Sequence, residues 1–150
     1  MIDEILSAIV QEMNAYFSKA SGSTEPIVVL SGLVNPDGTM AVQGENKILV
    51  TLVHIQEERR VNMQLKGTSN ATLSLHMLVS ACYGSANYAA SLKMISAVMQ
   101  FFVDQPVIST DGTNKVAITQ ENADFATMQG IWGMLGAKYM PCLLYRLRMG

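Results

Sequence analysis

The sequence predicts an α+β domain in which about three helices pack against a mixed or mostly antiparallel sheet. Three segments carry apolar residues at helical spacing, and several others show the β-branched, alternating pattern typical of strands. Their order is helix, about three strands, helix, hairpin, helix and strand. No internal repeat, low-complexity tract or linker interrupts the 150 residues, so we expect a single domain over residues 1–150.

The helices are predicted from apolar spacing and from residues typical of helix ends. In the first, apolar residues recur every three or four positions from Ile2 to Phe17, and a polar stop follows. The second, residues 85–104, has two apolar stripes, so we expect burial on more than one side, one of them a candidate subunit interface. The third is expected to begin at an Asn122 N-cap with Asp124 in its first turn, and to bury a stripe formed by Phe125, Met128, Trp132 and Leu135.

The strands are predicted at residues 27–34, 46–61, 71–82 and 142–149, with a hairpin over residues 107–119 around Asp111-Gly112. The segment 46–61 is apolar on both faces as far as Gln56, so most of it is expected to be a central strand. Strict alternation would put His54 on the same face as Leu52. The segment 71–82 alternates cleanly, which predicts one face covered by helices and one that is wetter or meets a partner. In the last strand, the residues expected to point outward are Leu144, Arg146 and Arg148.

Composition narrows the class of protein. Hydrophobic residues make up 49% of the chain and charged residues 15%, and mean hydropathy is +0.23. No apolar run approaches the ~20 residues that span a bilayer, and the start, MIDEI, is acidic where a signal peptide would be basic. We therefore expect no membrane partner and assign the apolar surplus to contacts with other protein chains. A net charge of −2 offers no footprint for nucleic acid, and two distant cysteines without a CxxC pair are compatible with a reducing cytoplasm.

Few residues suggest chemistry. His54 and His76 both lie in predicted strands, but spacing supplies no third metal ligand, and two ordinary hydrogen-bonded sheet histidines are the simpler reading. Glu57 and Glu58 are consecutive, so their carboxylates point to opposite faces of a strand and do not converge on one substrate. No nucleophile elbow, phosphate loop or cofactor motif is present in the sequence. We therefore expect a protein that is not an enzyme and uses no cofactor.

Three glycines recur at a spacing of three within the last predicted helix, at Gly130, Gly133 and Gly136. Glycine within a helix costs ~1 kcal/mol relative to alanine, so their presence needs a reason. Tight packing against the domain's own sheet is one reading, and we expect it for at least one of them. Close packing against a neighbouring subunit is the second reading, and Gly136 could instead be a left-handed C-cap.

Three segments in this order resemble one known family. They are NKILVTLVHIQEERR in the first half, LKMISAVMQFFVDQPVI in the middle and IWGMLGAKYMPCLLYRLRM at the end. The resemblance is to the tail-terminator (tail cap) proteins of phage-tail-like contractile injection systems, and it runs over nearly the whole chain. Its most characteristic residues are Trp132, Leu135, Gly136, Lys138, Tyr139, Pro141, Tyr145 and Arg148.

The resemblance implies a structural role. Members of this family look like compact protomers that form a six-subunit ring on the distal end of the inner tube and the last sheath layer. Such a ring ends polymerisation and holds the sheath extended, so the implied partners are further copies of the chain, the sheath protein and the inner tube protein. The implied location is the cytoplasm during assembly and the injection particle afterwards. A baseplate or tube-adjacent adaptor of the same machinery is the alternative, followed by a small enzyme that uses His54 and His76.

Two sets of residues are expected to make the contacts of such a ring. Glu57, Glu58, Arg59 and Arg60 form a candidate charge patch between subunits. Arg146 and Arg148, together with the backbone of their strand if it lies at a sheet edge, are candidates for contact with the sheath or a neighbouring subunit. Trp132 is a further candidate for the interface. A solvated strand face is the simpler alternative for each charged residue.

Overall fold

The computed structural model describes residues 1–22, 25–41, 46–61, 69–110 and 114–149, with backbone alone for residues 21, 59–61 and 69–72. The elements in chain order are α1 (Ile2–Ser21), β1 (Val28–Leu30), β2 (Lys47–Val61), β3 (Ser69–Cys82), a short 3-10 turn (Ser85–Asn87), α2 (Tyr88–Asp104), β4 (Val107–Thr110), β5 (Asn114–Glu121), α3 (Phe125–Leu135) and β6 (Cys142–Met149). The α+β class, with a mixed sheet and three helices, is confirmed. None of the helices among the described residues is long and apolar enough to cross a membrane.

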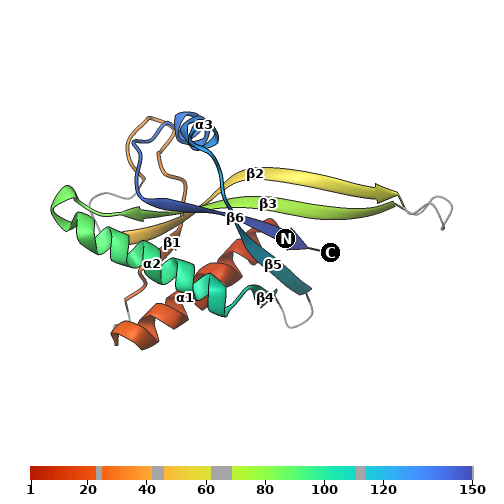
Figure 1. Cartoon of the computed structure of the whole chain (residues 1–150), viewed down its shortest axis with the longest axis horizontal. Helices are drawn as coiled ribbons and strands as arrows, with labels where there is room; N and C mark the ends of the chain where they lie inside the picture. The colour runs from red at the N-terminus through yellow and green to blue at the C-terminus, as the bar shows by residue number, and fades with distance from the viewer. Residues whose placement is uncertain (23–24, 42–45, 62–68, 111–113, 150) are drawn as a thin grey trace.

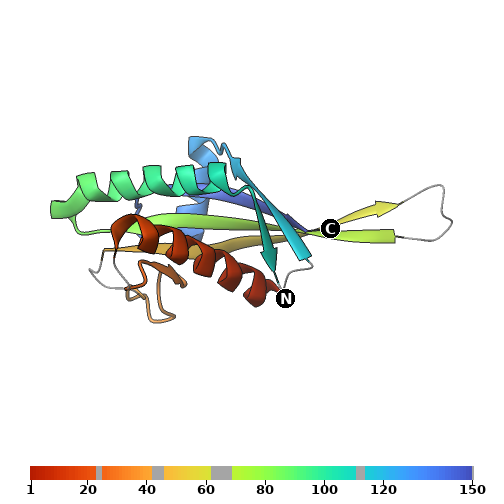
Figure 2. The ribbon, with the colours of Figure 1, turned by 90° about the horizontal axis from the view of Figure 1, so that it is seen from below.

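The six strands form one sheet in the order β1-β2-β3-β6-β5-β4. The short β1 runs parallel to β2, and every other pair is antiparallel. The helices α1 and α2 cover one face, and α3 lies on the other (Figure 1). Figure 2 shows α1 and α2 next to each other on their face. The predicted strand 27–34 is shorter than expected, because the chain leaves β2 after Leu30 and Leu33 turns inward beneath α3.

The last strand is not an edge strand, which corrects the expectation for residues 142–149. β6 pairs with β3 on one side, from Leu73↔Met149 to Ser80↔Cys142, and with β5 on the other. Its backbone groups are therefore used within the sheet and are not available to a partner. A strand inside the sheet is covered on both faces, and β6 has apolar side chains for both: Leu144 and Tyr145 point to opposite faces and are both buried.

A register shift in β2 overturns the expected position of His54. Leu52 pairs with Met77, but His54 pairs with His76, so Val53 is an additional residue in the strand. The bulge moves His54 away from the face of Leu52 to the α3 face of the sheet. Strict alternation over residues 48–55 could not reveal this shift, since a single extra residue reverses the faces of all that follow.

The helix ends follow local chemistry. α1 ends at Gly22, whose φ of 70° is the left-handed conformation that favours glycine. α3 begins two residues later than expected, because Asp124 and not Asn122 is its N-cap, with the carboxylate accepting a hydrogen bond from the Thr127 backbone N–H at 2.8 Å. Gly136 has a φ of 68° and is the left-handed C-cap, which confirms that reading of this glycine.

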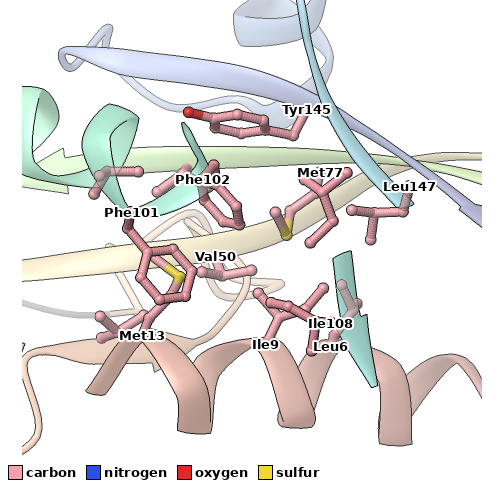
Figure 3. Close-up of a cluster of buried hydrophobic side chains, with 14 of the residues drawn as sticks. Leu6, Ile9, Met13, Val50, Met77, Phe101, Phe102, Ile108, Tyr145 and Leu147 are labelled. Carbon is pink, nitrogen blue, oxygen red and sulfur yellow. The ribbon is translucent and has the colours of Figure 1, made fainter. Parts of the chain in front are cut away.

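The core divides at the sheet. The larger cluster fills the space between the sheet and the helices α1 and α2, where Phe101 and Phe102 meet Tyr145 and residues of α1 (Figure 3). Rings contact edge to face there, with Phe101 and Phe102 centroids 4.9 Å apart. The smaller cluster lies under α3, where Trp132 packs among Leu49, Leu78 and Leu144. The fold therefore buries apolar residues on both faces of its central strands.

One polar side chain fixes α1 to the sheet edge. The Asn14 side-chain oxygen accepts hydrogen bonds from the backbone N–H groups of Ile27 and Val28, at 3.0 and 2.9 Å, and its amide donates to the Val28 carbonyl at 2.9 Å. Asn14 thus pairs with the outward backbone groups of β1, which would otherwise need a neighbouring strand. It positions β1 at the start of the sheet.

Candidate interaction surfaces

A network of charged and polar side chains lies on the α3 face of the sheet, next to α3 itself. Arg146 of β6 extends across β3, donates from Nε to the Ser74 hydroxyl at 2.9 Å and forms an ion pair with Glu58 of β2. Pairing of Arg146 with His76, and of Glu58 with Thr72, places these side chains on one face. Arg146 is half-buried and already paired within the protomer, and its contact with the sheath or a neighbouring subunit stays a prediction.

The two histidines lie opposite each other in this network. The His54 and His76 ring centroids are 5.3 Å apart, and His76 Nδ1 lies 3.1 Å from Glu121 Oε2. Among the described residues, no group of three or more His, Cys, Asp or Glu side chains could hold a metal ion. Both are sheet histidines, the simpler of the two readings of the sequence, although in the described part of the chain only His76 Nδ1 has a hydrogen-bond partner and the buried His76 Nε2 has none.

The charge patch predicted at residues 57–60 does not lie on one face. Glu57 pairs with Leu73 and Glu58 with Thr72, so their side chains point to opposite faces of β2, as expected for consecutive strand residues. Arg59 and Arg60 continue the strand in register, and their side chains lie outside the described residues. Arg148, by contrast, is exposed. Whether these residues contact another chain stays a prediction.

The outer edge of β2 is open beyond the point where β1 ends. The last β1 pair is Leu30↔Val50, followed by a hydrogen bond from the Ser31 backbone N–H to the Val50 carbonyl. From there to Val61, no described strand pairs with the outer side of β2. β2 and β3 then extend past the end of β6 as a two-stranded arm (Figure 1). An open strand edge of this kind accepts an added strand.

An apolar groove borders α3 on its β6 side, with a volume of about 880 Å³. Its lining includes Phe125, Met128, Trp132, Gly133, Tyr139 and Leu143. Phe125 is 95% exposed, which corrects its expected place in the buried stripe, because it is the first helical residue and stands at the mouth of the groove. Trp132 is 6% exposed and contributes to this lining. Its ring packs edge to face on Tyr139, with centroids 5.5 Å apart.

The glycines of α3 face outward. A Cβ added at Gly130 or Gly133 would meet nothing within 4 Å, so neither glycine is required for packing on the domain's own sheet. The expectation that at least one of the three packs tightly against that sheet is therefore wrong.

The helix α2 exposes one of its two apolar stripes. Val98, Phe101 and Phe102 are buried against the sheet and α1. Another side is open along the helix, with Tyr88 at 54%, Leu92 at 46%, Met99 at 41% and Val103 at 71% exposure. The sequence predicted burial on more than one side, one of them a candidate subunit interface, and in the protomer this second side is exposed. The sheet and α1 together are wide enough to cover only one flank of this helix.

The titratable groups near these surfaces are not activated nucleophiles. Burial raises the pKa of the Cys142 thiol, with a smaller opposing effect from a hydrogen bond with Trp132, and burial also raises the pKa of Cys82. Burial raises the pKa of Tyr145 to about 12. A thiol whose pKa lies above its ordinary value is mostly protonated at neutral pH and reacts slowly.

Comparison with known families decides which class of protein this is. A family model described as the Pvc16 N-terminal domain matches residues 4–150. The chain belongs to the Pvc16 N-terminal domain family. Among solved structures, it is similar to the sheath/tube terminator of PVC, an extracellular contractile injection system, determined by cryo-electron microscopy in the extended state. The TM-score is 0.68 at 13% identity, over 99% of this chain and 55% of that chain. No curated protein matches.

Membership of the Pvc16 N-terminal domain family confirms the resemblance to tail-terminator proteins, and the structural match confirms the fold class. This domain spans about half the length of the solved terminator chain. Sequence reasoning missed two features of the Pvc16 N-terminal domain, the β2 bulge and the open β2 edge. It did anticipate one apolar side of α2 as a candidate subunit interface, and the uncharged sequence of α3 was a signal for a further exposed apolar surface.

Proposed function

We propose that this protein is a structural terminator of a contractile injection system. In this proposal it forms a hexameric ring on the distal end of the inner tube and the last sheath layer, ends polymerisation and stabilises the extended sheath. The observation that supports it best is the agreement in fold with a PVC sheath/tube terminator over 99% of the chain. Its partners are then further copies of itself, the sheath protein and the inner tube protein, without nucleic acid, membrane or cofactor. It is assembled in the cytoplasm and remains part of the particle.

The surfaces of the protomer support a role in assembly. The described residues offer an open strand edge, an apolar groove and an exposed apolar helix stripe. Exposed apolar surface on this scale marks sites of protein contact. The described polar network, in contrast, is largely paired within the protomer: Arg146 binds Glu58 and Ser74, and His76 Nδ1 lies 3.1 Å from Glu121, while the buried His76 Nε2 has no hydrogen-bond partner among the described residues. We therefore propose that the protein has no catalytic role.

The contact with the sheath is proposed at the β2 edge. With β6 inside the sheet, the outer edge of β2 from Thr51 onward is the surface that could take up an extended segment of a sheath subunit. Glu57, Glu58, Arg59 and Arg60 lie along this edge strand, where charge discourages indiscriminate pairing. Arg148 is proposed to contact the sheath or a neighbouring subunit. Substituting Arg148 by Glu should reduce the fraction of terminated particles, and an unchanged fraction would count against that contact.

Deletion of the gene in a particle-producing strain tests the function. Electron micrographs should show tubes and sheaths of irregular length or prematurely contracted particles, and the wild-type gene should restore uniform extended ones. Uniform, extended particles in the deletion strain would overturn the proposal. Complementation with His54→Gln/His76→Gln separates the structural role from an enzymatic one. This variant should restore termination, whereas a histidine-dependent enzyme would fail to do so.

A further inference from the structure

Two exposed apolar surfaces of the protomer differ in shape. The first, here called the α2 ridge, consists of Tyr88, Leu92, Met99 and Val103. Their spacing of four, seven and four positions keeps them in a line on one flank of the helix. No charged residue lies within this line, although Lys93 and Asp104 are present elsewhere on α2. The ridge is a row of large apolar side chains along a helix of 17 residues.

The second surface, here called the α3 groove, is hollow. It is the 880 Å³ apolar groove beside α3, whose walls include Phe125, Trp132 and Tyr139. α3 has no charged residue between Phe125 and Leu135. Gly130 and Gly133 leave open space beside the helix backbone, so another chain can approach closely. A surface with these properties accommodates a row of large apolar side chains.

Within one protomer the two helices that carry these surfaces pack on opposite faces of the sheet, and the surfaces come near each other only at one end, where burial, Cys142 and, least of the three, Tyr88 raise the pKa of Tyr139. α2 packs on the sheet face that carries Met77 and Tyr145, and α3 packs on the opposite face (Figures 1 and 2). A second copy of the chain can supply the missing partner for either surface, since each protomer has one ridge and one groove. The ridge line carries no charged side chain, and the one charged residue among the described residues that line the groove, Glu121, already lies 3.1 Å from His76 Nδ1, so the contact would leave no unpaired charge among them.

We propose that the α2 ridge of one protomer packs into the α3 groove of the next, a contact that rests on the ring proposed above. Each protomer uses two different patches, so the contact is head-to-tail and repeats until the ring closes. The glycines then have a function. At the free surface each costs ~1 kcal/mol relative to alanine, and in the assembly they permit the approach of the neighbouring helix.

Crosslinking in whole particles tests the contact. In a Cys142→Ser background, Val103→Cys on the ridge is combined with Gln129→Cys on α3, and particles are treated with a short bismaleimide. We expect covalent multimers of the chain on denaturing gels. Each single-cysteine variant should give none, and the matched control, Lys93→Cys with Gln129→Cys, should lose the multimers because Lys93 lies on another flank of α2. Absence of multimers, with the protein retained in the particles, would overturn the inference.

Two further outcomes separate this inference from the proposed function. A crosslinked product containing the sheath or tube protein would show that another chain occupies the groove, and would overturn the second-copy assignment while leaving the terminator role intact. Failure of the proposed function itself appears in the deletion experiment, as uniform particles without the protein. A Gly133→Gln variant gives an independent check. It should fold as stably as the wild type or more so, yet lose the multimers.

Discussion

Arg146 of β6 forms an ion pair with Glu58 of β2 across the intervening strand β3, and Arg146 Nε also donates to Ser74 at 2.9 Å. These residues tie the middle of the sheet to the base of the arm. Arg146→Ala would leave the half-buried Glu58 carboxylate without its counter-ion. We expect the free energy of unfolding to fall by about 2 kcal/mol, the range of hydrogen bonds to charged groups. Urea unfolding measures it.

The control for this pair is the neighbouring exposed arginine. Arg148→Ala should change the free energy of unfolding by less than about 0.5 kcal/mol, as surface substitutions usually do. A double-mutant cycle with Glu58→Ala and Arg146→Ala should give a clear coupling energy. Equal effects of the two arginine variants would mean that the pair adds no stability.

Asn14 is expected to be a critical residue of α1. Asn14→Ala removes three hydrogen bonds to the backbone of Ile27 and Val28, and leaves these groups without a protein partner. The free energy of unfolding should fall by about 2–3 kcal/mol, because unpaired backbone groups carry a desolvation penalty. Asn14→Asp keeps the oxygen that accepts from both N–H groups but places a carboxylate against the Val28 carbonyl. If Asn14→Asp lowers the free energy of unfolding by less than Asn14→Ala does, the acceptor oxygen contributes more than the amide donor.

Gly136 and Gly133 should respond in opposite ways to the same substitution. Gly136→Ala forces a side chain into a φ of 68°, and should lower the free energy of unfolding by about 1 kcal/mol. Gly133→Ala, in open space within the helix, should raise it by a similar amount. Thermal unfolding of both variants beside the wild type measures the difference. A loss of stability in Gly133→Ala would show that this glycine matters within the protomer.

The N-cap of α3 predicts a pH dependence. A hydrogen bond from the Thr127 backbone N–H, with a smaller one from its side chain, lowers the pKa of Asp124 below 3.8. The ionised Asp124 carboxylate therefore adds its full contribution to the free energy of unfolding above pH 3.8, the ordinary pKa of the group. That contribution is lost as the pH falls through the lowered pKa of the folded state. The difference in melting temperature between wild type and Asp124→Ala should be constant from pH 7 to about pH 5 and shrink at lower pH. A difference independent of pH would argue against the carboxylate as the cap.

Much of the fold followed from local pattern. The helix α1, the long strands β2 and β3 and the residue range of β6 were predicted from periodicity. The hairpin of β4 and β5 was predicted from its turn at Asp111-Gly112, and the turn itself lies outside the described residues. The errors arose where tertiary contacts decided the outcome. The extra residue at Val53 moved His54 to the other face, and sheet order placed β6 internally. Phe125 and Leu92 belong to apolar stripes that fold outward, because periodicity identifies a stripe but not what covers it.

The central place of β6 affects how the chain is made. The sheet consists of one block, β1-β2-β3, and another, β5-β4, and these blocks are joined only through residues 142–149. A nascent chain that has not yet released this strand from the ribosome therefore has two unfinished half-sheets, each with an open side. Native structure must form after translation of this region, and contacts between sequence-distant strands form slowly. A polypeptide truncated before Cys142 therefore lacks the strand that unites the two halves of the sheet.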